Sequence, residues 1–413
     1  MAQHDAIPDQ PSISHWIEWL ATYGQTENGG VTRLLYSESW QRAQEAMKEL
    51  MLQHGCQVRF DEVGNLFGRY PGREQPKAII LTGSHIDTVI DGGKYDGAYG
   101  ILASMLAAHL LYLKYGPPKK TIEVVSLAEE EGSRFPFTFW GSKWVTGQVE
   151  LEEAKALLDS NGFSLEEAMK QAGFGQPTLA LKEKEKIEAF LEVHIEQGVM
   201  LERKQKEIGI VTDIVGQRRY TLQFQGESNH AGTTPMSMRK DALRLAAAFI
   251  THVTEEAERL DESLVATIGK VVVSPNTPNV IAGGVECSLD VRHANVAYLD
   301  AFEKIVFDYR EIAKKQNMQM DINRWLNIKP VHLSDKHVQL TRQQAEEAGF
   351  SYDVMVSGAG HDAQVFGTFC PTSLIFVPSH KGISHSPEEY THWQELEKGV
   401  EILKRQLYTL AYE

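Results

Sequence analysis

The sequence contains few cysteines and no long apolar run. Its three cysteines, Cys56, Cys287 and Cys370, are far apart in 413 residues and form no C-x-x-C pair. We therefore expect neither a disulfide framework nor a cysteine-ligated zinc site. No stretch reaches the roughly 18 apolar residues of a membrane span. The segment from Met1 to Ser14 is polar and lacks the regions of a secretory signal, so we expect a cytoplasmic protein with no membrane partner.

An excess of positive charge is also missing. The chain has 41 lysines and arginines against 56 acidic residues, which gives a formal net charge of −15. This balance argues against nucleic acid or an anionic membrane surface as the main partner. Hydrophobic residues make up 42% and charged residues 23%, as in ordinary globular proteins. The length is enough for two or three ordinary domains or one very large one.

Apolar runs that alternate with amphipathic segments predict an α/β protein. We expect buried strands at 78–83, 121–128, 190–195 and 373–377, and a strong helix at 101–115 that Gly116-Pro117-Pro118 ends. The charged stretch 151–190 is interpreted as helical. This rhythm of strand, loop, helix and strand is typical of a sheet with helices on its faces.

The middle of the chain has a different pattern. Strands are expected at 219–226, 264–273, 285–292 and 321–325, with amphipathic helices at 240–260 and 300–316. Their order is β-α-β-β-α-β, which is the ferredoxin-like arrangement. We therefore predict a discontinuous catalytic domain at 1–213 and 330–413, interrupted by an inserted α+β domain at 214–329.

Histidines and acidic residues follow several of the apolar strands. His85 and Asp96 flank a glycine-rich stretch after the strand at 78–83, and Glu129-Glu130-Glu131 follows the strand at 121–128. His194 lies at the end of a third strand, and His385 lies in a later glycine-containing turn. Strand ends carry the sites of open α/β sheets. Imidazoles with carboxylates favour zinc, manganese or cobalt over calcium or an iron–sulfur cluster.

Five motifs in order resemble the dinuclear metallopeptidase and amidohydrolase superfamily, which includes aminoacylases, carboxypeptidase G-type enzymes and N-carbamoyl-L-amino acid hydrolases. The motifs are Gly83-Ser84-His85-Ile86-Asp87-Thr88-Val89, Asp96-Gly97, Glu130-Glu131-Gly132, Glu192-Val193-His194 and His385-Ser386. The resemblance covers nearly the whole chain. It implies a mixed-sheet catalytic domain of the dinuclear metallopeptidase type, with a ferredoxin-like dimerisation or lid domain inserted in it.

The resemblance also implies two divalent metal ions per subunit, which would be manganese, zinc or cobalt. Their ligands would be His85, Asp96, Glu131, His194 and His385, with Asp96 bridging the two ions.

Two further acids take roles from the same resemblance. Glu130 corresponds to the general base that takes a proton from water and delivers it to the leaving nitrogen. Asp87 corresponds to the acid that orients His85 and fixes its tautomer.

Two segments resemble the ureido-hydrolysing branch of the superfamily, namely 131–135 and His194-Ile195-Glu196-Gln197-Gly198. The aromatic segment 135–143 is most similar to that of allantoate amidohydrolases. We therefore expect hydrolysis of a linear C–N bond in a ureido group, converting allantoate to ureidoglycine, ammonia and carbon dioxide in purine degradation. The alternatives are an N-carbamoyl-L-amino acid hydrolase and a metallo-aminopeptidase or dipeptidase. A non-enzymatic binding protein is disfavoured because the base and all the ligands are present.

The segment 226–235 resembles the part of the family whose histidine reaches the active site of the partner subunit. The resemblance therefore implies a homodimer in which His230 polarises the scissile carbonyl and stabilises the oxyanion. The alternative is an ordinary loop histidine.

Further residues are predicted to bind the small-molecule ureido substrate. Arg292 ends a strand, and its guanidinium suits a bidentate grip on a substrate carboxylate, although a structural salt bridge is the alternative. Gln217 matches a substrate-contact position, and Asn279 suits a polar substrate group. The turn containing Gly358 and Ala359 is predicted to offer backbone N–H donors.

Overall fold

The computed structural model describes residue 7, residues 11–176 and residues 185–413. The chain divides into two compact units. Unit 1 comprises Met1–Thr212 and His332–Glu413, and unit 2 comprises Asp213–Val331. Among the described residues, no helix combines the length and the apolar character needed to cross a membrane.

The described part of unit 1 is built on a nine-stranded mixed sheet. Its strands are β1 (Gln57–Phe60), β2 (Leu66–Tyr70), β3 (Gln75–His85), β4 (Lys120–Leu127), β5 (Lys186–Ile195), β6 (Ile208–Ile214), β12 (Val331–His332), β13 (Tyr352–Ser357) and β14 (Thr372–Val377). The order along the sheet is β1-β2-β4-β3-β5-β14-β6-β12, with β13 paired to β6. The four neighbours β4, β3, β5 and β14 run parallel, whereas β2 and β6 join this block antiparallel.

The parallel block forms because its strands carry apolar runs and are buried along most of their length. All residues of β14 are buried, as are nearly all of β4 and the last seven of β3. Parallel strands covered on both faces have this composition. Since parallel strands all end at the same edge, the segments that follow β3, β4, β5 and β14 meet there.

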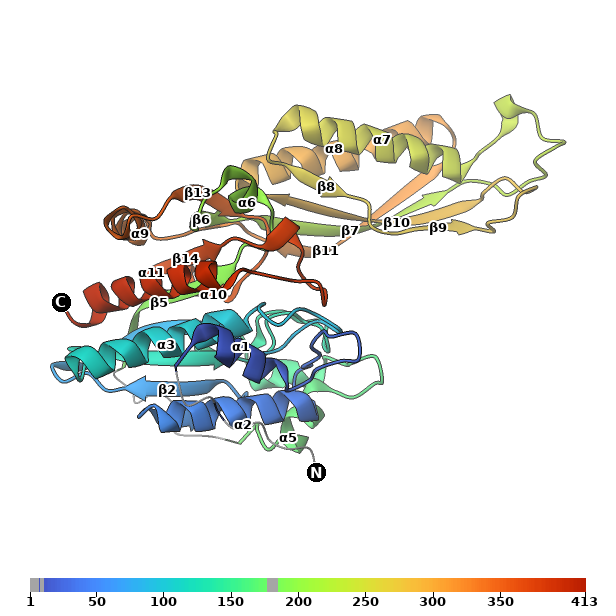
Figure 1. Cartoon of the computed structure of the whole chain (residues 1–413). Helices are drawn as coiled ribbons and strands as arrows, with labels where there is room; N and C mark the ends of the chain where they lie inside the picture. Colours follow the sequence, from blue (N-terminus) through green and yellow to red (C-terminus); the bar gives the residue numbers. More distant parts are fainter. Residues whose placement is uncertain (1–6, 8–10, 177–184) are drawn as a thin grey trace. The chain divides into compact units, whose positions relative to one another are not determined.

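Helices cover the sheet of unit 1. They are α1 (Ile13–Ala21), α2 (Glu38–Gln53), α3 (Ala98–Tyr115), α4 (Trp140–Val145), α5 (Leu165–Gln171), α6 (Met200–Lys204), α9 (Asp335–Ala348), α10 (Asp362–Phe366) and α11 (Trp393–Ala411), with short 3-10 helices η1 (Leu151–Lys155) and η3 (His380–Gly382). The long helices α3 and α11 pack against each other and on the parallel strands (Figure 1). Helix α3 is apolar on almost every side, as a helix buried between other elements must be.

Unit 2 has its own antiparallel sheet and core. Its elements are β7 (Gly216–Gln225), η2 (Met236–Met238), α7 (Ala242–Leu260), β8 (Val265–Thr267), β9 (Val271–Ser274), β10 (Gly284–His293), α8 (Val296–Lys315) and β11 (Gln319–Ile328). The sheet order is β11-β7-β10-β8, and β9 also pairs with β10. Burial alternates along β7 and β10, so one face of the sheet packs under α7 and α8.

The mixed α/β prediction is confirmed, but two local predictions are wrong. The segment 151–190 is not one helical region: it holds η1 and α5, and β5 already begins at Lys186. Ile187 is buried between the more exposed Lys186 and Glu188, which is the period-2 pattern of a strand end. Residues 177–184 of that prediction lie outside the described residues. The single strand expected at 264–273 is two short strands, β8 and β9.

Candidate metal centre and active site

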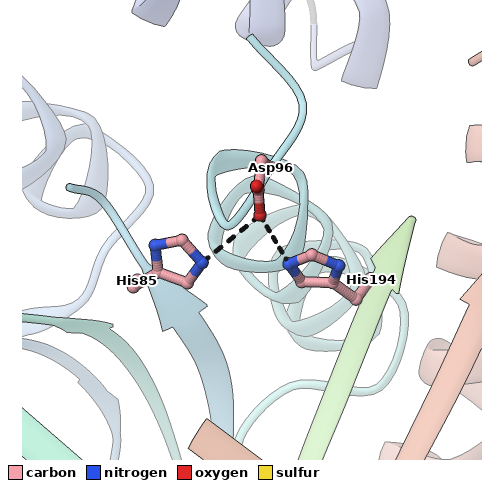
Figure 2. Close-up of side chains that lie close together, drawn as sticks. All are labelled: His85, Asp96 and His194. Carbon is pink, nitrogen blue, oxygen red and sulfur yellow. Dashed lines mark ion pairs between the residues drawn. The ribbon is translucent and has the colours of Figure 1, made fainter. Parts of the chain in front are cut away.

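The first of two ligand groups comprises His85, Asp96 and His194, all of which are buried. His85 is the last residue of β3, His194 lies near the end of β5, and Asp96 precedes α3 (Figure 2). The Asp96 Oδ1 atom lies 3.5 Å from His85 Nε2 and 3.1 Å from His194 Nε2. The structure thus brings together three residues that span more than a hundred positions of the sequence.

The second ligand group comprises Asp96, Glu131 and His385. The other oxygen of Asp96, Oδ2, lies 3.1 Å from His385 Nε2, and His385 Nε2 lies 3.4 Å from Glu131 Oε1. Within each group the ligand atoms all lie within 4.8 Å of one another. Nitrogen and carboxylate oxygen donors in groups of three fit zinc, manganese or cobalt. One Asp96 oxygen faces each group, which is the arrangement that a bridging carboxylate requires.

Gly97 explains why the backbone can turn so sharply beside the metal ligands. Its φ is +63°, in the left-handed region. A Cβ atom at this position would lie 2.4 Å from the His85 carbonyl oxygen and 2.5 Å from its ring carbon Cε1. Only glycine therefore lets the loop that carries Asp96 approach His85 closely enough.

Backbone carbonyls orient the two buried imidazoles. His85 Nδ1 lies 3.0 Å from the carbonyl oxygen of Asp87, and His194 Nδ1 lies 2.9 Å from that of Ile195. An Nδ1–H that donates to a carbonyl leaves the Nε2 lone pair directed at the ligand group. Both Nε2 atoms face Asp96 in this way.

The carboxylate of Asp87 contacts the glutamates more closely than it contacts His85. Its nearest approach to His85 Nδ1 is 3.7 Å. Its two oxygens instead accept the backbone N–H groups of Glu130 and Glu131, each at 3.1 Å. Glu129, just before them, has φ +54°. This local geometry directs two consecutive glutamates into the same site.

Glu130 is placed beside the first ligand group without belonging to either group among the described residues. Its Oε2 atom lies 4.0 Å from His85 Nε2. Burial raises the pKa of Glu130 well above its ordinary value, with His85 opposing the shift and Glu131 reinforcing it. A carboxyl group with a raised pKa beside the ligands suits proton transfer.

The other acids of the site also respond to burial. Burial, and then the nearby Asp96, raise the pKa of Glu131 to about 8. Burial alone would raise the pKa of Asp96 too, but hydrogen bonds from His194, His385 and His85 outweigh it and hold that pKa well below its usual value. Several buried acidic side chains lie close together here, with few cationic side chains near them. The positive charge of bound cations would stabilise them.

More buried polar groups lie beneath the ligands. Glu192, two residues before His194, accepts the hydroxyl of Ser84 at 2.6 Å and the N–H of Ala363 at 2.9 Å. It thereby joins β3, β5 and α10 behind the site. The ring of His361 lies 4.6 Å from that of His194. Burial, and then the charge of Glu192, raise the pKa of the neighbouring Asp362 to about 7.

Unit 2 brings Gln217 and Arg292 together. They are direct partners across β7 and β10. Both contact Asp290: Gln217 Nε2 donates to its Oδ2 at 2.6 Å, and Arg292 Nε donates to its Oδ1 at 3.0 Å. Asp290 lies two positions before Arg292 on the same strand face, so this ion pair was foreseeable from the sequence.

His230 and Asn279 also lie in unit 2 and are neighbours. The backbone of His230 bridges that of Val280, and the N–H of Ala231 donates to the Asn279 carbonyl at 3.0 Å. The side chain of His230 is exposed, and its Nδ1 accepts the N–H of Gly232 at 3.0 Å.

The turn with Gly358 and Ala359 connects β13 to α10 in unit 1. The N–H of Ala359 donates to the hydroxyl of Ser357 at 3.2 Å. The aromatic segment contacts this turn, because a Cβ atom at Gly360 would lie 2.9 Å from Phe139 Cζ. Phe135 and Trp140 of the same segment are fully buried in the core.

Three polar residues beside the ligands were not predicted to have a role. They are Gln197, Ser384 and Glu389. The only sequence signal was that Gln197 lies in the His194-Ile195-Glu196-Gln197-Gly198 motif and that Ser384 directly precedes His385.

Known proteins resemble this chain over nearly its whole length. The model of peptidase family M20/M25/M40 matches residues 81–409. The allantoate amidohydrolase of Bacillus subtilis (strain 168) is 48% identical over 97% of this chain and 98% of its own length. The allantoate amidohydrolase of Escherichia coli (strain K12) is 44% identical over 97% and 98%. An amidase of the hydantoinase/carbamoylase family from Burkholderia multivorans superposes with a TM-score of 0.91 at 34% identity, covering 97% of both chains.

Proposed function

The chain belongs to peptidase family M20/M25/M40, and from this premise we propose that it hydrolyses allantoate with two divalent metal ions, manganese, zinc or cobalt, bound per subunit. The observation that carries the proposal is the pair of ligand groups sharing Asp96, with Glu130 beside them. This arrangement serves hydrolysis of an amide-like bond, which needs an activated water and a proton carrier.

The choice of substrate follows the degree of similarity. The two allantoate amidohydrolases are 48% and 44% identical to this chain. The N-carbamoyl-L-amino-acid amidohydrolases of Paenarthrobacter aurescens and Geobacillus stearothermophilus are 35% and 36% identical. All four relatives match over more than nine-tenths of the chain, so the difference reflects divergence rather than coverage. An N-carbamoyl-L-amino acid is the second candidate, favoured by the structural likeness to a hydantoinase/carbamoylase amidase.

In the proposed reaction, water adds to a ureido carbonyl carbon and the bond from that carbon to the terminal nitrogen breaks. Ammonia leaves, and the resulting carbamate loses carbon dioxide to give ureidoglycine. Bound metal ions would acidify the water and polarise the carbonyl. Glu130 takes the water proton on a carboxylate oxygen and returns it to the leaving nitrogen, for which its place 4.0 Å from His85 Nε2 suits it.

The remaining side chains would bind the substrate. We propose that Arg292 grips the substrate carboxylate and that Gln217 and Asn279 hold its ureido groups, assisted by the turn of Gly358 and Ala359. A guanidinium is suited to two parallel hydrogen bonds with a carboxylate.

The assembly and location of the enzyme are also part of the proposal. We propose a cytoplasmic homodimer in which His230 of one subunit acts at the site of the other and stabilises the oxyanion.

A substrate comparison tests the function. The metal-free protein, reloaded in parallel with manganese, zinc or cobalt, is assayed for ammonia release from allantoate, methionine release from N-carbamoyl-methionine and cleavage of a dipeptide. We expect the highest kcat/KM with allantoate. A higher value with the carbamoyl amino acid would replace the substrate assignment, dipeptide cleavage alone would indicate a peptidase, and no turnover with any metal would refute an enzymatic role.

A further inference from the structure

A buried carboxylate outside both ligand groups joins the loop of Asp96 to the loop of His385. Glu389 is only 4% exposed. Its Oε1 atom accepts the backbone N–H groups of Tyr95 at 3.0 Å and Asp96 at 3.1 Å. Its Oε2 atom accepts the hydroxyl of Ser384, the residue before His385, at 2.7 Å. One side chain thus fixes two segments that lie almost three hundred residues apart.

The amide of Gln197 completes a ring of hydrogen bonds. Its Nε2 atom donates to Asp96 Oδ2 at 3.0 Å and to the Ser384 hydroxyl oxygen at 3.2 Å. Ser384 therefore accepts from Gln197 while it donates to Glu389. Gln197 has φ +54°, a backbone conformation that costs energy in a residue other than glycine. The ring runs from Glu389 through Ser384 and Gln197 to the side chain of Asp96, and from the backbone of Asp96 back to Glu389.

The two ligand groups depend on this ring to different extents. In the first group, the side chains of His85 and His194 are 3% and 2% exposed. Backbone carbonyls next to each ring also orient them. In the second group, the side chain of His385 is 48% exposed. It has φ +55°, and it follows directly after Ser384. In the second group His385 therefore has less packing to hold it than the other ligands, and it has more need of the hydrogen-bond ring.

We propose that Glu389, Ser384 and Gln197 are positioning residues that act on the metal affinity of the second group, Asp96, Glu131 and His385, far more than on that of the first. Partners of this kind, one layer behind the ligands, alter metal affinity by about 10- to 100-fold when removed. This inference rests on one part of the proposed function, namely that the protein binds metal ions. It does not depend on the substrate, because its test uses none.

Metal titration of the variants tests the inference. Metal-free wild type, Ser384→Ala and Glu389→Gln are titrated calorimetrically with manganese and, separately, with zinc, and bound metal is counted after dialysis. The wild type should bind two equivalents. In each variant one equivalent should keep its affinity, while the other weakens about 10- to 100-fold. In Glu389→Gln an amide nitrogen replaces the carboxylate oxygen that accepts the Ser384 hydroxyl. This nitrogen donates to the Ser384 oxygen, which already accepts from Gln197, so the ring loses one acceptor.

Glu388→Gln provides the matched control, because Glu388 is the exposed neighbour of Glu389. This variant should bind both metal equivalents with the affinities of the wild type. Equal weakening of both equivalents, or two unchanged equivalents in both variants, would overturn the inference. Circular dichroism and thermal unfolding of the metal-free proteins check folding. Ser384→Ala removes only one hydroxyl, so it decides the question if Glu389→Gln fails to fold. Selective loss of one metal in a protein that cleaves none of the tested substrates would uphold this inference while the proposed function failed.

Discussion

Replacing Asp87 with asparagine tests how the backbone of Glu130 and Glu131 is held in the site. The Asp87 side chain is 1% exposed and accepts the two backbone N–H groups at 3.1 Å each. Asparagine has the same shape and keeps one oxygen that can accept a hydrogen bond. Its amide nitrogen, however, is a donor and cannot accept the other backbone N–H group. A hydrogen bond to a charged acceptor contributes about 1.5–3 kcal/mol, and a buried donor without a partner costs about 1–3 kcal/mol. Burial raises the pKa of Asp87, so the cost of burying its charge offsets part of these terms, and we expect the metal-free variant to lose about 1–3 kcal/mol of unfolding free energy.

The same substitution should lower turnover while one metal remains bound. The His85 ring donates to the backbone carbonyl of residue 87, which asparagine retains, so the first ligand group should persist. Glu130 and Glu131 should shift, and a displacement of about 1 Å near the reacting atoms lowers kcat about 100-fold. Urea unfolding, metal counting and steady-state kinetics measure the three effects. Loss of the metal at His85 with unchanged stability would refute this reasoning, because the carboxylate would then act mainly on the imidazole.

Three further outcomes follow from the same geometry. Glu130→Gln should keep both metals and lose about 100- to 10,000-fold in kcat, since the proton carrier is gone; turnover near the wild-type rate would rule out Glu130 as the base. Arg292→Lys should raise KM about tenfold or more with little change in kcat, because lysine cannot form the bidentate pair, and an unchanged KM would argue against the carboxylate grip. Burial, and then the charge of Lys336, lower the pKa of His337 from 6.5 to about 4. As the pH falls below 6.5, His337 therefore binds a proton in the unfolded chain but not in the folded chain. The free energy of unfolding, which is at its full value above pH 6.5, falls by about 2.5 kcal/mol by about pH 4.5. Denaturant titrations should show this loss in the wild type but not in His337→Leu, and equal losses in both proteins would contradict it.

The location of the first ligand group at the ends of strands followed from patterns that are local in the sequence, whereas the choice of its members came from the family resemblance. Apolar runs before His85 and around His194 predicted buried strands, and buried parallel strands end at a common edge. The Asp96-Gly97 pair comes soon after the first of these strands in the sequence, so the loop that carries Asp96 can fold back to the end of that strand. These three residues meet in the structure at distances of 3.1 and 3.5 Å between Asp96 and the two rings.

The supporting contacts could not be predicted in the same way. Glu389 acts on the backbone of Tyr95 and Asp96, and no local pattern links residues so far apart in the chain. The strand β5 begins inside a charged stretch whose spacing suited a helix, and only its pairing with β3 and β14 decides the conformation. The ion pair of Arg292 with Asp290 could have been predicted from the sequence, because residues two apart on a strand share one face of the sheet.

The positions of the ligands along the chain also affect how the protein is made. A ribosome releases the N-terminal part first, so His85, Asp96 and His194 are all available when roughly half of the 413 residues have been synthesised. His385 and Glu389 are synthesised roughly 190 residues after His194, shortly after β14, which pairs with β5 beside His194. A nascent or truncated chain that stops between His194 and His385 can therefore present the ligands of the first group but not those of both groups. The second group is complete only after residue 385 has been synthesised.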